Sequence, residues 1–298
     1  MGVTGPAAAA PDALDQLRQH ALELVNQARA QNGLPALKAG SKLDQAAQAH
    51  AEDMLRRRYY AHDTPEGKDP RDRYLAAGGS PSSLIEENIA RCQRCPVPPE
   101  AAAVDSLQRS WMASPEHRDN ILARGIDRMG FGIAGDQEAL YAVQDFAGPG
   151  VSRGAEDGQA SAPLPPDRVT AAFADALNGA RKQAGASPLQ TDGTLTEAAR
   201  KLLPPPNGTR LDLRGSLADA IPAKRRRDYG SLAALAGACT GCGPAPTAAD
   251  ARWFAEDWLK DQKHRADLLD RRATRLGAAL RADGAGGKTA LVLVAAPR

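Results

Sequence analysis

The sequence predicts an α+β fold, built as two tandem domains that each cover an antiparallel sheet with helices. The first observation is length, because 298 residues correspond to about two ordinary domains. The second is a repeat, since SWMASPEHRDNILARGIDRMGFGI at 110–133 returns in diverged form as DWLKDQKHRADLLDRRATRLGAAL at 257–280. A period near 150 residues is too long for a solenoid, so each copy is expected to have its own core.

The repeat extends beyond these two stretches. An offset of 147 residues holds from the cysteines onward, and an offset of 152 holds near the start of each copy. The matched pairs include Trp111 with Trp258, His117 with His264, Gly130 with Gly277, Cys92 with Cys239, Cys95 with Cys242, Asn26 with Asn178 and Arg29 with Arg181. Trp111 and Trp258 are therefore expected at equivalent places in two cores.

Two amphipathic helices are expected at the start of the first copy. Apolar residues at helical spacing predict one helix from Leu14 that Gly33 ends. The same spacing predicts a second helix over 41–60, with Ser41 as its N-cap.

The rest of the first copy changes from helices to strands. A third helix is expected over 98–113, and a short one follows Pro115. MGFGIAG at 129–135 and ALYAVQDFAG at 139–148 are rich in strand formers and predict a hairpin. Helices that precede strands, instead of alternating with them, are typical of the α+β class.

Changes in composition mark the expected boundaries. We expect an N-terminal linker at 1–11, a first domain at 12–148, a second linker at 149–165 and a second domain at 166–298. Gly, Pro, Ser and Ala dominate the second linker without periodicity. The opening MGVTGPAAAAP has neither a charged start nor an apolar core of the usual length, so it does not read as a signal peptide.

Composition excludes several functional classes. With 42% hydrophobic and 25% charged residues, the chain is of the globular type, and no apolar run reaches the roughly 18 residues of a membrane span. Basic runs occur at Arg56–Arg58 and Lys224–Arg227. Aromatic residues make up only 4% and do not accompany these runs, so we expect solvated helix ends or loops and no nucleic-acid partner.

Five segments of the first copy, taken together, resemble one known family. They are LVNQARAQNGLPAL, LDQAAQAHAEDMLRRRYYAHDTPEG, EENIA, WMASPEHRDNIL and the MGFGIA and YAVQDFA pair. They are similar to the CAP superfamily (cysteine-rich secretory proteins, antigen 5 and pathogenesis-related 1) in its bacterial SCP-like form. The resemblance implies an α-β-α sandwich with a surface cleft, and export as a secreted or periplasmic protein.

Three cleft residues carry over from the resemblance: His62, Glu87 and His117. Two imidazoles and a carboxylate are sufficient to hold a divalent metal such as zinc with an open fourth position, or to act as an acid/base set. Glu86 stands where the family usually has Gly, and a second cleft glutamate has no clear counterpart. The alternative reading makes His62 a loop anchor and His117 a helix cap. His20 is expected at the surface and His50 in a structural role.

The second copy has lost most of this cleft. Ala234 stands in the place of Glu87, and LLPPPNGTR at 202–210 replaces the segment that carries His62. His264 remains and is expected to stand without partners. The second copy is therefore interpreted as a degenerate CAP-like domain that serves as a structural or partner-binding lobe.

The four cysteines form two CxxC pairs, Cys92 with Cys95 and Cys239 with Cys242. Local disulfides are favoured if the protein is exported, as the resemblance implies. One zinc held by all four thiolates, disulfides between the repeats and a thioredoxin-type redox pair are the alternatives.

Three functions stay open at this point. The first is an exported binding or interaction protein with a divalent-metal site in the first-domain cleft, whose partner is an unknown ligand, protein or cell-envelope component. The second is a metal-assisted or acid/base hydrolase of peptide or cell-wall material. The third is lipid or sterol binding, which rests on the resemblance alone. Whether the protein is an enzyme is left undecided.

Overall fold

A computed structural model describes residues 11–155, 162–206, 211 and 213–298. The expected linker at 1–11 falls almost entirely outside these residues, as do parts of the segments 149–165 and 202–210. The chain divides into two compact units. The first comprises residues 1–80 and 84–148, and the second comprises residues 81–83 and 149–298.

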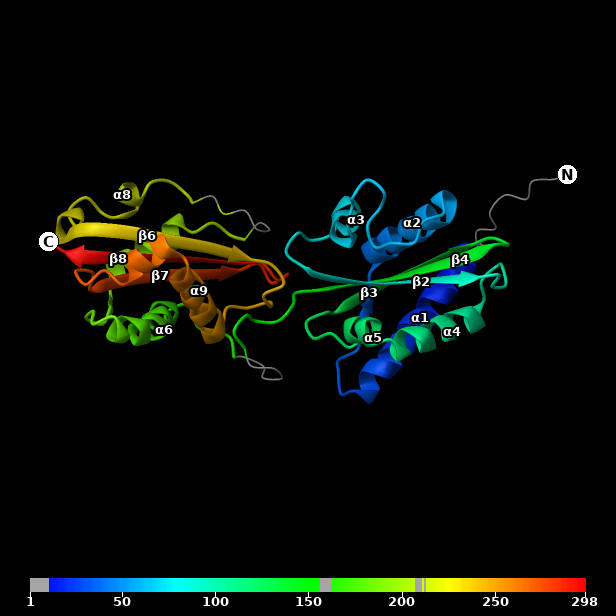
Figure 1. The fold of residues 1–298 in the computed structure, drawn as a ribbon. Helices are drawn as coiled ribbons and strands as arrows, with labels where there is room; N and C mark the ends of the chain where they lie inside the picture. Colours follow the sequence, from blue (N-terminus) through cyan, green and yellow to red (C-terminus); the bar gives the residue numbers. More distant parts are fainter. Residues whose placement is uncertain (1–10, 156–161, 207–210, 212) are drawn as a thin grey trace. The chain divides into compact units, whose positions relative to one another are not determined.

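The first unit is a three-layer sandwich (Figure 1). Helices α1, α4 and α5 cover one face of its sheet, and α2 and α3 cover the other. The sheet has the order β1-β3-β4-β2. The elements are α1 (Pro11–Gln31), β1 (Lys38–Ala39), α2 (Ser41–Arg57), α3 (Pro70–Ala76), β2 (Leu84–Gln93), α4 (Ala101–Ala113), α5 (Pro115–Ile121), β3 (Arg128–Gly135) and β4 (Ala139–Gly148).

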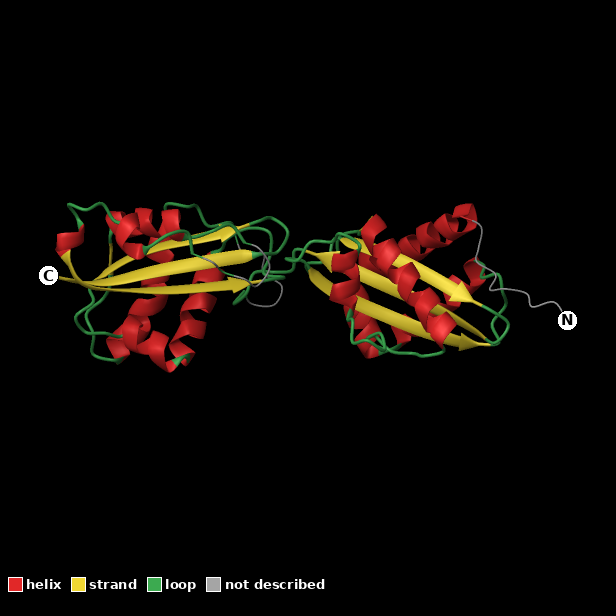
Figure 2. Ribbon diagram, turned by 90° about the horizontal axis from the view of Figure 1, so that it is seen from above, coloured by secondary structure: helices red, strands yellow, loops and turns green. Residues whose placement is uncertain are grey.

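The second unit repeats this arrangement, with helices on both faces of a sheet of order β5-β7-β8-β6 (Figures 1 and 2). Its elements are α6 (Val169–Gln183), β5 (Gln190–Thr191), α7 (Gly193–Leu202), α8 (Leu217–Ala220), the 3₁₀ turn η1 (Arg226–Asp228), β6 (Tyr229–Cys239), α9 (Ala248–Lys260), α10 (Gln262–Leu268), β7 (Arg275–Ala282) and β8 (Lys288–Pro297). The predicted tandem α+β fold is confirmed. No helix among the described residues is both long and apolar enough to cross a bilayer.

Two details of the sequence prediction are wrong. The sheets are mixed, because β1 pairs with β3 in parallel and β5 pairs with β7 in parallel. In each unit, several helices and one strand lie between the two parallel strands along the chain, and this connection is long enough to bring the second strand back in the same direction. Helix α2 begins at Ser41, but its N-cap is Gly40, without a side-chain cap.

Residues that the two copies share have structural roles in both units. Trp111 and Trp258 are buried on the equivalent helices α4 and α9. A Cβ atom on Gly130 would lie 2.2 Å from the backbone carbon of Leu43, and one on Gly277 would lie 2.2 Å from that of Leu195. Only glycine lets α2 and α7 approach their sheets this closely.

Arg29 and Arg181 are buried at equivalent positions, and their guanidinium groups donate hydrogen bonds to backbone carbonyl oxygens. The Arg29 guanidinium donates to the carbonyl of Pro35 at 2.9 Å and to that of Ile121 at 2.8 Å. Arg181 donates to the carbonyl of Ser187 at 2.8 Å in the same way. The repeat therefore preserves the residues that build the fold.

The four cysteines form two local disulfides in the described structure. Cys92 is bonded to Cys95 at the end of β2, and Cys239 is bonded to Cys242 at the end of β6. The favoured prediction of local pairing is confirmed. The same element order places both disulfides at the same point of the fold.

Candidate functional site

The site begins with Glu87, which lies in the middle of β2 with its carboxylate almost wholly buried. Its Oε1 lies 2.7 Å from Nδ1 of His62, on the segment between α2 and α3. The His62 ring is half exposed, and none of the described residues hydrogen-bonds its Nε2. The fold thus brings two of the three cleft residues into direct contact and leaves one imidazole nitrogen available.

Arg73 of α3 engages the other oxygen of Glu87. Its guanidinium also donates to the carbonyl oxygens of His62 and Lys68, at 2.7 and 3.0 Å. Burial raises the pKa of Glu87, but the hydrogen bond from His62 and the charge of Arg73 outweigh it, so this pKa lies below its ordinary value. Glu87 is an ionised carboxylate with both oxygens occupied.

His117 lies on α5, which hydrogen bonds dock against β2. The Asn88 side chain donates to the carbonyl of His117 at 3.1 Å, and the Asn120 side chain donates to the carbonyl of Glu87 at 3.0 Å. Burial, and then the positive charge of His62, lower the pKa of His117. The hydrogen bond to Glu87 raises the pKa of His62. The two imidazoles therefore lie within electrostatic range of each other.

The predicted three-ligand metal set is not assembled in this arrangement. Among the described residues there is no group of three His, Cys, Asp or Glu side chains placed to hold a metal ion. Arg73 occupies the oxygen that Glu87 would offer. Nε2 of His62 and the imidazole of His117 are the donors that remain from the predicted metal set.

A second carboxyl group, Asp145, pairs directly with Glu87 across β2 and β4. Its side chain is buried, and neither oxygen has a hydrogen-bond partner within the described part of the chain. Burial, and then the negative charge of Glu87, raise the pKa of Asp145 well above its ordinary value. Sequence reasoning missed this residue, although an acid within the apolar run YAVQDFA was a signal.

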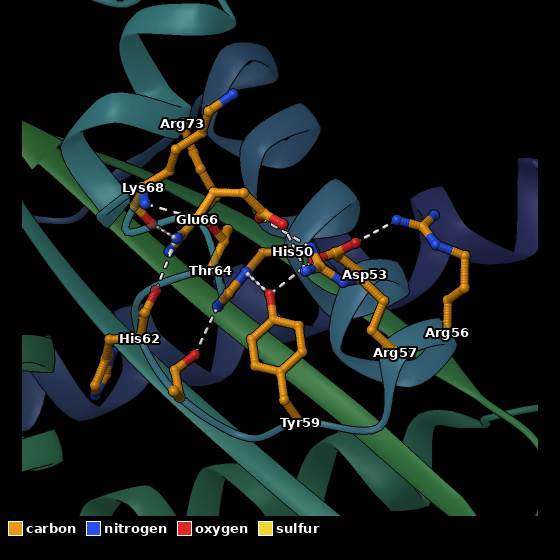
Figure 3. A network of polar contacts seen from close by, with 11 residues as sticks. His50, Asp53, Arg56, Arg57, Tyr59, His62, Thr64, Glu66, Lys68 and Arg73 are labelled. Carbon is orange, nitrogen blue, oxygen red and sulfur yellow. Dashed lines mark hydrogen bonds and ion pairs between the residues drawn. The ribbon is translucent and has the colours of Figure 1, made fainter.

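A polar network at the end of α2 holds the segment that carries His62 (Figure 3). His50 is buried, as its expected structural role requires, and its Nε2 lies 2.9 Å from the carbonyl oxygen of Ala61. The Tyr59 hydroxyl donates to Asp53 at 2.9 Å and lies 3.3 Å from Nδ1 of His50. The backbone directly before His62 is thereby fixed to α2.

His20 differs from its predicted surface role. Its side chain is about one-third exposed, and its Nε2 lies 2.7 Å from Asp105 of α4. The side chain links α1 to α4, because these helices pack side by side on one face of the sheet.

The second unit has apolar residues where the first has its paired acids. Ala234 of β6 faces Leu293 of β8, at the positions that Glu87 and Asp145 hold in the first unit. His264 was expected to stand without partners, but its Nδ1 lies 3.5 Å from Asp261. Asp261 is the N-cap of α10, so this contact belongs to the helix start and not to a cleft.

A known family model matches this chain over most of the first unit. Residues 22–146 match the model described as CAP: Cysteine-rich secretory protein family. The predicted resemblance is confirmed over this range. An uncharacterized protein of Bacillus subtilis, YkwD, is 30% identical over 145 residues, which cover 49% of this chain and 52% of that protein. The chain therefore spans about half the length of this relative.

Two solved structures are each similar to this chain over about half of its length. An extracellular SCP-domain protein from Bacillus anthracis is 26% identical, with a TM-score of 0.37, over 47% of this chain and 44% of that one. An outer surface protein from Borrelia burgdorferi is 18% identical, with a TM-score of 0.39, over 49% of this chain and 98% of that one.

Proposed function

We propose that this chain, whose first unit carries a CAP domain, is an exported binding protein that uses the His62 and His117 cleft to hold a divalent cation and its ligand. The observation that carries the proposal is the orientation of His62. Its Nδ1 faces Glu87 at 2.7 Å, while Nε2 is left for a ligand. A carboxylate on one ring nitrogen fixes the tautomer and orientation of a metal-binding imidazole.

The donor set fits a cation bound by two imidazoles. Glu87 accepts a hydrogen bond from Nδ1 of His62, and its other oxygen bonds Arg73, so we assign it to orienting His62 and not to binding the ion directly. A divalent ion such as zinc accepts two neutral imidazoles and leaves positions for water or for groups of a bound ligand. Burial lowers the pKa of His117 and so favours the neutral ring, which is the form that binds a metal.

Hydrolysis is the weaker alternative. A carboxylate that serves as the general base must be free to accept a proton near neutral pH. Glu87 is bonded to both His62 and Arg73, and its pKa lies below its ordinary value. Lipid or sterol binding remains a prediction from the resemblance, with no observation in this structure that favours it.

Export is supported by two features. Two disulfides suit an oxidising compartment outside the cytosol. The relatives named above include an extracellular protein and an outer surface protein. A secreted or periplasmic location therefore agrees with a binding role toward a cell-envelope component.

Calorimetric titration of the intact protein with zinc tests the proposal. Wild type is expected to bind one equivalent, and His62→Ala or His117→Ala is expected to weaken binding by roughly 100-fold or more, because each removes one of two direct ligands. His264→Ala in the second unit is the matched control and should bind as wild type. Equal zinc affinity in all four proteins would show that the ion binds elsewhere.

A further inference from the structure

A hollow lies at one end of the sheet in the first unit. It has a volume of about 450 Å³ and sits where the outer end of β2 meets the turn between β3 and β4. Its lining is mostly cationic and amide-bearing: Arg58, Arg91, Gln93, Arg94, Gln137, Glu138, Ala139 and Tyr141. None of these residues takes part in the proposed metal site.

The charges of this hollow are not balanced. Arg58 is neutralised by Asp136 at 2.6 Å and by Glu138 at 3.4 Å. Arg91 lies over the ring of Tyr60, 5.6 Å from its centroid, which orients the guanidinium without cancelling its charge. Arg94 has no side-chain hydrogen bond or ion pair with any described residue. Two guanidinium groups are therefore available to an anion.

The backbone at Arg94 shows that this arginine is not required by the fold. Arg94 has a φ of 55°, in the left-handed region that favours glycine. Its counterpart at the offset of 147 residues is Gly241, whose φ is 62°. A non-glycine residue here costs about 1 kcal/mol. The first unit thus places a cationic side chain where the second unit uses glycine for the same turn.

The other polar residues of the hollow are also missing from the second unit. At the same offset, Ala238 replaces Arg91 and Thr240 replaces Gln93. The cysteines on either side are retained, and both disulfides form. The turn therefore folds without the arginines, and their presence in the first unit calls for an explanation outside folding.

From this hollow we infer a binding site for an acidic saccharide, recognised by Arg91 and Arg94 through its carboxylate or phosphate groups. Guanidinium groups bind such oxygens with paired, charge-assisted hydrogen bonds. The carboxamides of Gln93 and Gln137 offer both donors and acceptors, which suits neighbouring hydroxyl groups. Only Ala139 and Tyr141 are apolar in the lining, so little is provided for the apolar side chains of a peptide.

The test is calorimetric titration of the intact protein in EDTA, which keeps it independent of the metal site. The probes are an oligogalacturonide, which carries carboxylates, and a phosphorylated mannan oligosaccharide, which carries phosphates. We expect the wild-type protein to bind at least one of these probes. The affinity should fall at high ionic strength, because salt screens the charges. Which probe binds identifies the source of the acidic groups.

The variant Arg91→Ala/Arg94→Gly inserts the residues that the second unit uses, so it should fold with its disulfide intact. We expect this variant to bind the acidic probe at least roughly tenfold more weakly than wild type. A tenfold loss of affinity corresponds to about one charge-assisted hydrogen bond. The control Arg225→Ala/Arg227→Ala removes two positive charges from the exposed basic run of the second unit and should stay within about twofold of wild type.

Three results would overturn the inference. They are no binding of either acidic probe, equal weakening by the two double variants, or equally tight binding of polyglutamate with the same dependence on Arg91 and Arg94. The second result would mean that net charge alone attracts the polymer. The third would mean that the site recognises acidic peptides.

Discussion

At the scale of single residues, the cleft depends on how Glu87 divides its two oxygens. One oxygen orients His62, and the other is held by Arg73, which also fixes the backbone of His62. A buried carboxylate needs such partners to stay ionised. The same arrangement removes Glu87 from direct metal binding and leaves it as the support of a histidine ligand.

Asp145 provides a residue-scale prediction about pH. Its pKa is raised above the ordinary value in the folded state by burial and by the charge of Glu87, so the folded protein holds a proton that the unfolded chain releases. This bound proton stabilises the folded state fully below about pH 4, and the stabilisation is lost as pH rises through the folded pKa. Over that range the free energy of unfolding falls by at most about 1.4 kcal/mol per pH unit.

The variant Asp145→Asn is neutral at every pH and lacks this dependence. Urea unfolding followed between pH 4 and 8 should therefore show the variant gaining stability over wild type as pH rises. The intact protein has two units, so the transition of the first unit is the one to compare. A constant difference between the two proteins across this range would contradict a raised pKa at Asp145.

At the scale of elements, the contact of β3 and β7 with the helices above them gives a second prediction. Gly130→Ala places a Cβ atom 2.2 Å from the backbone of α2, and Gly277→Ala places one 2.2 Å from the backbone of α7. The helix must move to relieve either contact. Each variant is expected to lose about 1–3 kcal/mol of stability in its own unit. Gly179→Ala is the control, because a Cβ atom there meets nothing within 4 Å inside α6.

Denaturant unfolding followed by tryptophan fluorescence reports on both units, because Trp111 is buried in the first and Trp258 in the second. Gly179→Ala should be neutral or stabilising by about 0.5–1 kcal/mol, since alanine favours helix more than glycine. Stability losses of the same size in all three variants would indicate that the close approach of helix and sheet is not the cause.

The elements also show what the sequence could and could not reveal. The long helices and the β3–β4 hairpin follow from residue spacing, since α1 and α2 place an apolar stripe on one side. Helix α3 and its Arg73 were missed, because seven residues with a capping box at Asp69 and Asp72 give little periodicity. Asp145 was missed because its partner Glu87 lies 58 positions away and meets it only through strand register.

At the scale of the whole molecule, one fold occurs twice, and the acid pair of Glu87 and Asp145 is found in the first unit alone among the described residues. The shared residues, such as Arg29 and Arg181, satisfy the same backbone groups in both units. The residues that differ include Glu87, Asp145 and the arginines of the hollow. The second unit therefore keeps the scaffold, with Ala234 and Leu293 filling the place of the acid pair.

The central claim is that His62, Glu87 and His117 form one electrostatically coupled cleft in the first unit. Carbon-detected NMR titration of the five histidines in the intact protein tests it most directly. The expected result is that the pKa of His62 lies above 6.5 and that of His117 below 6.5. Glu87→Gln should lower the pKa of His62, because it removes the negative charge at Nδ1. Ordinary pKa values at both histidines, unchanged by Glu87→Gln, would contradict the coupled cleft.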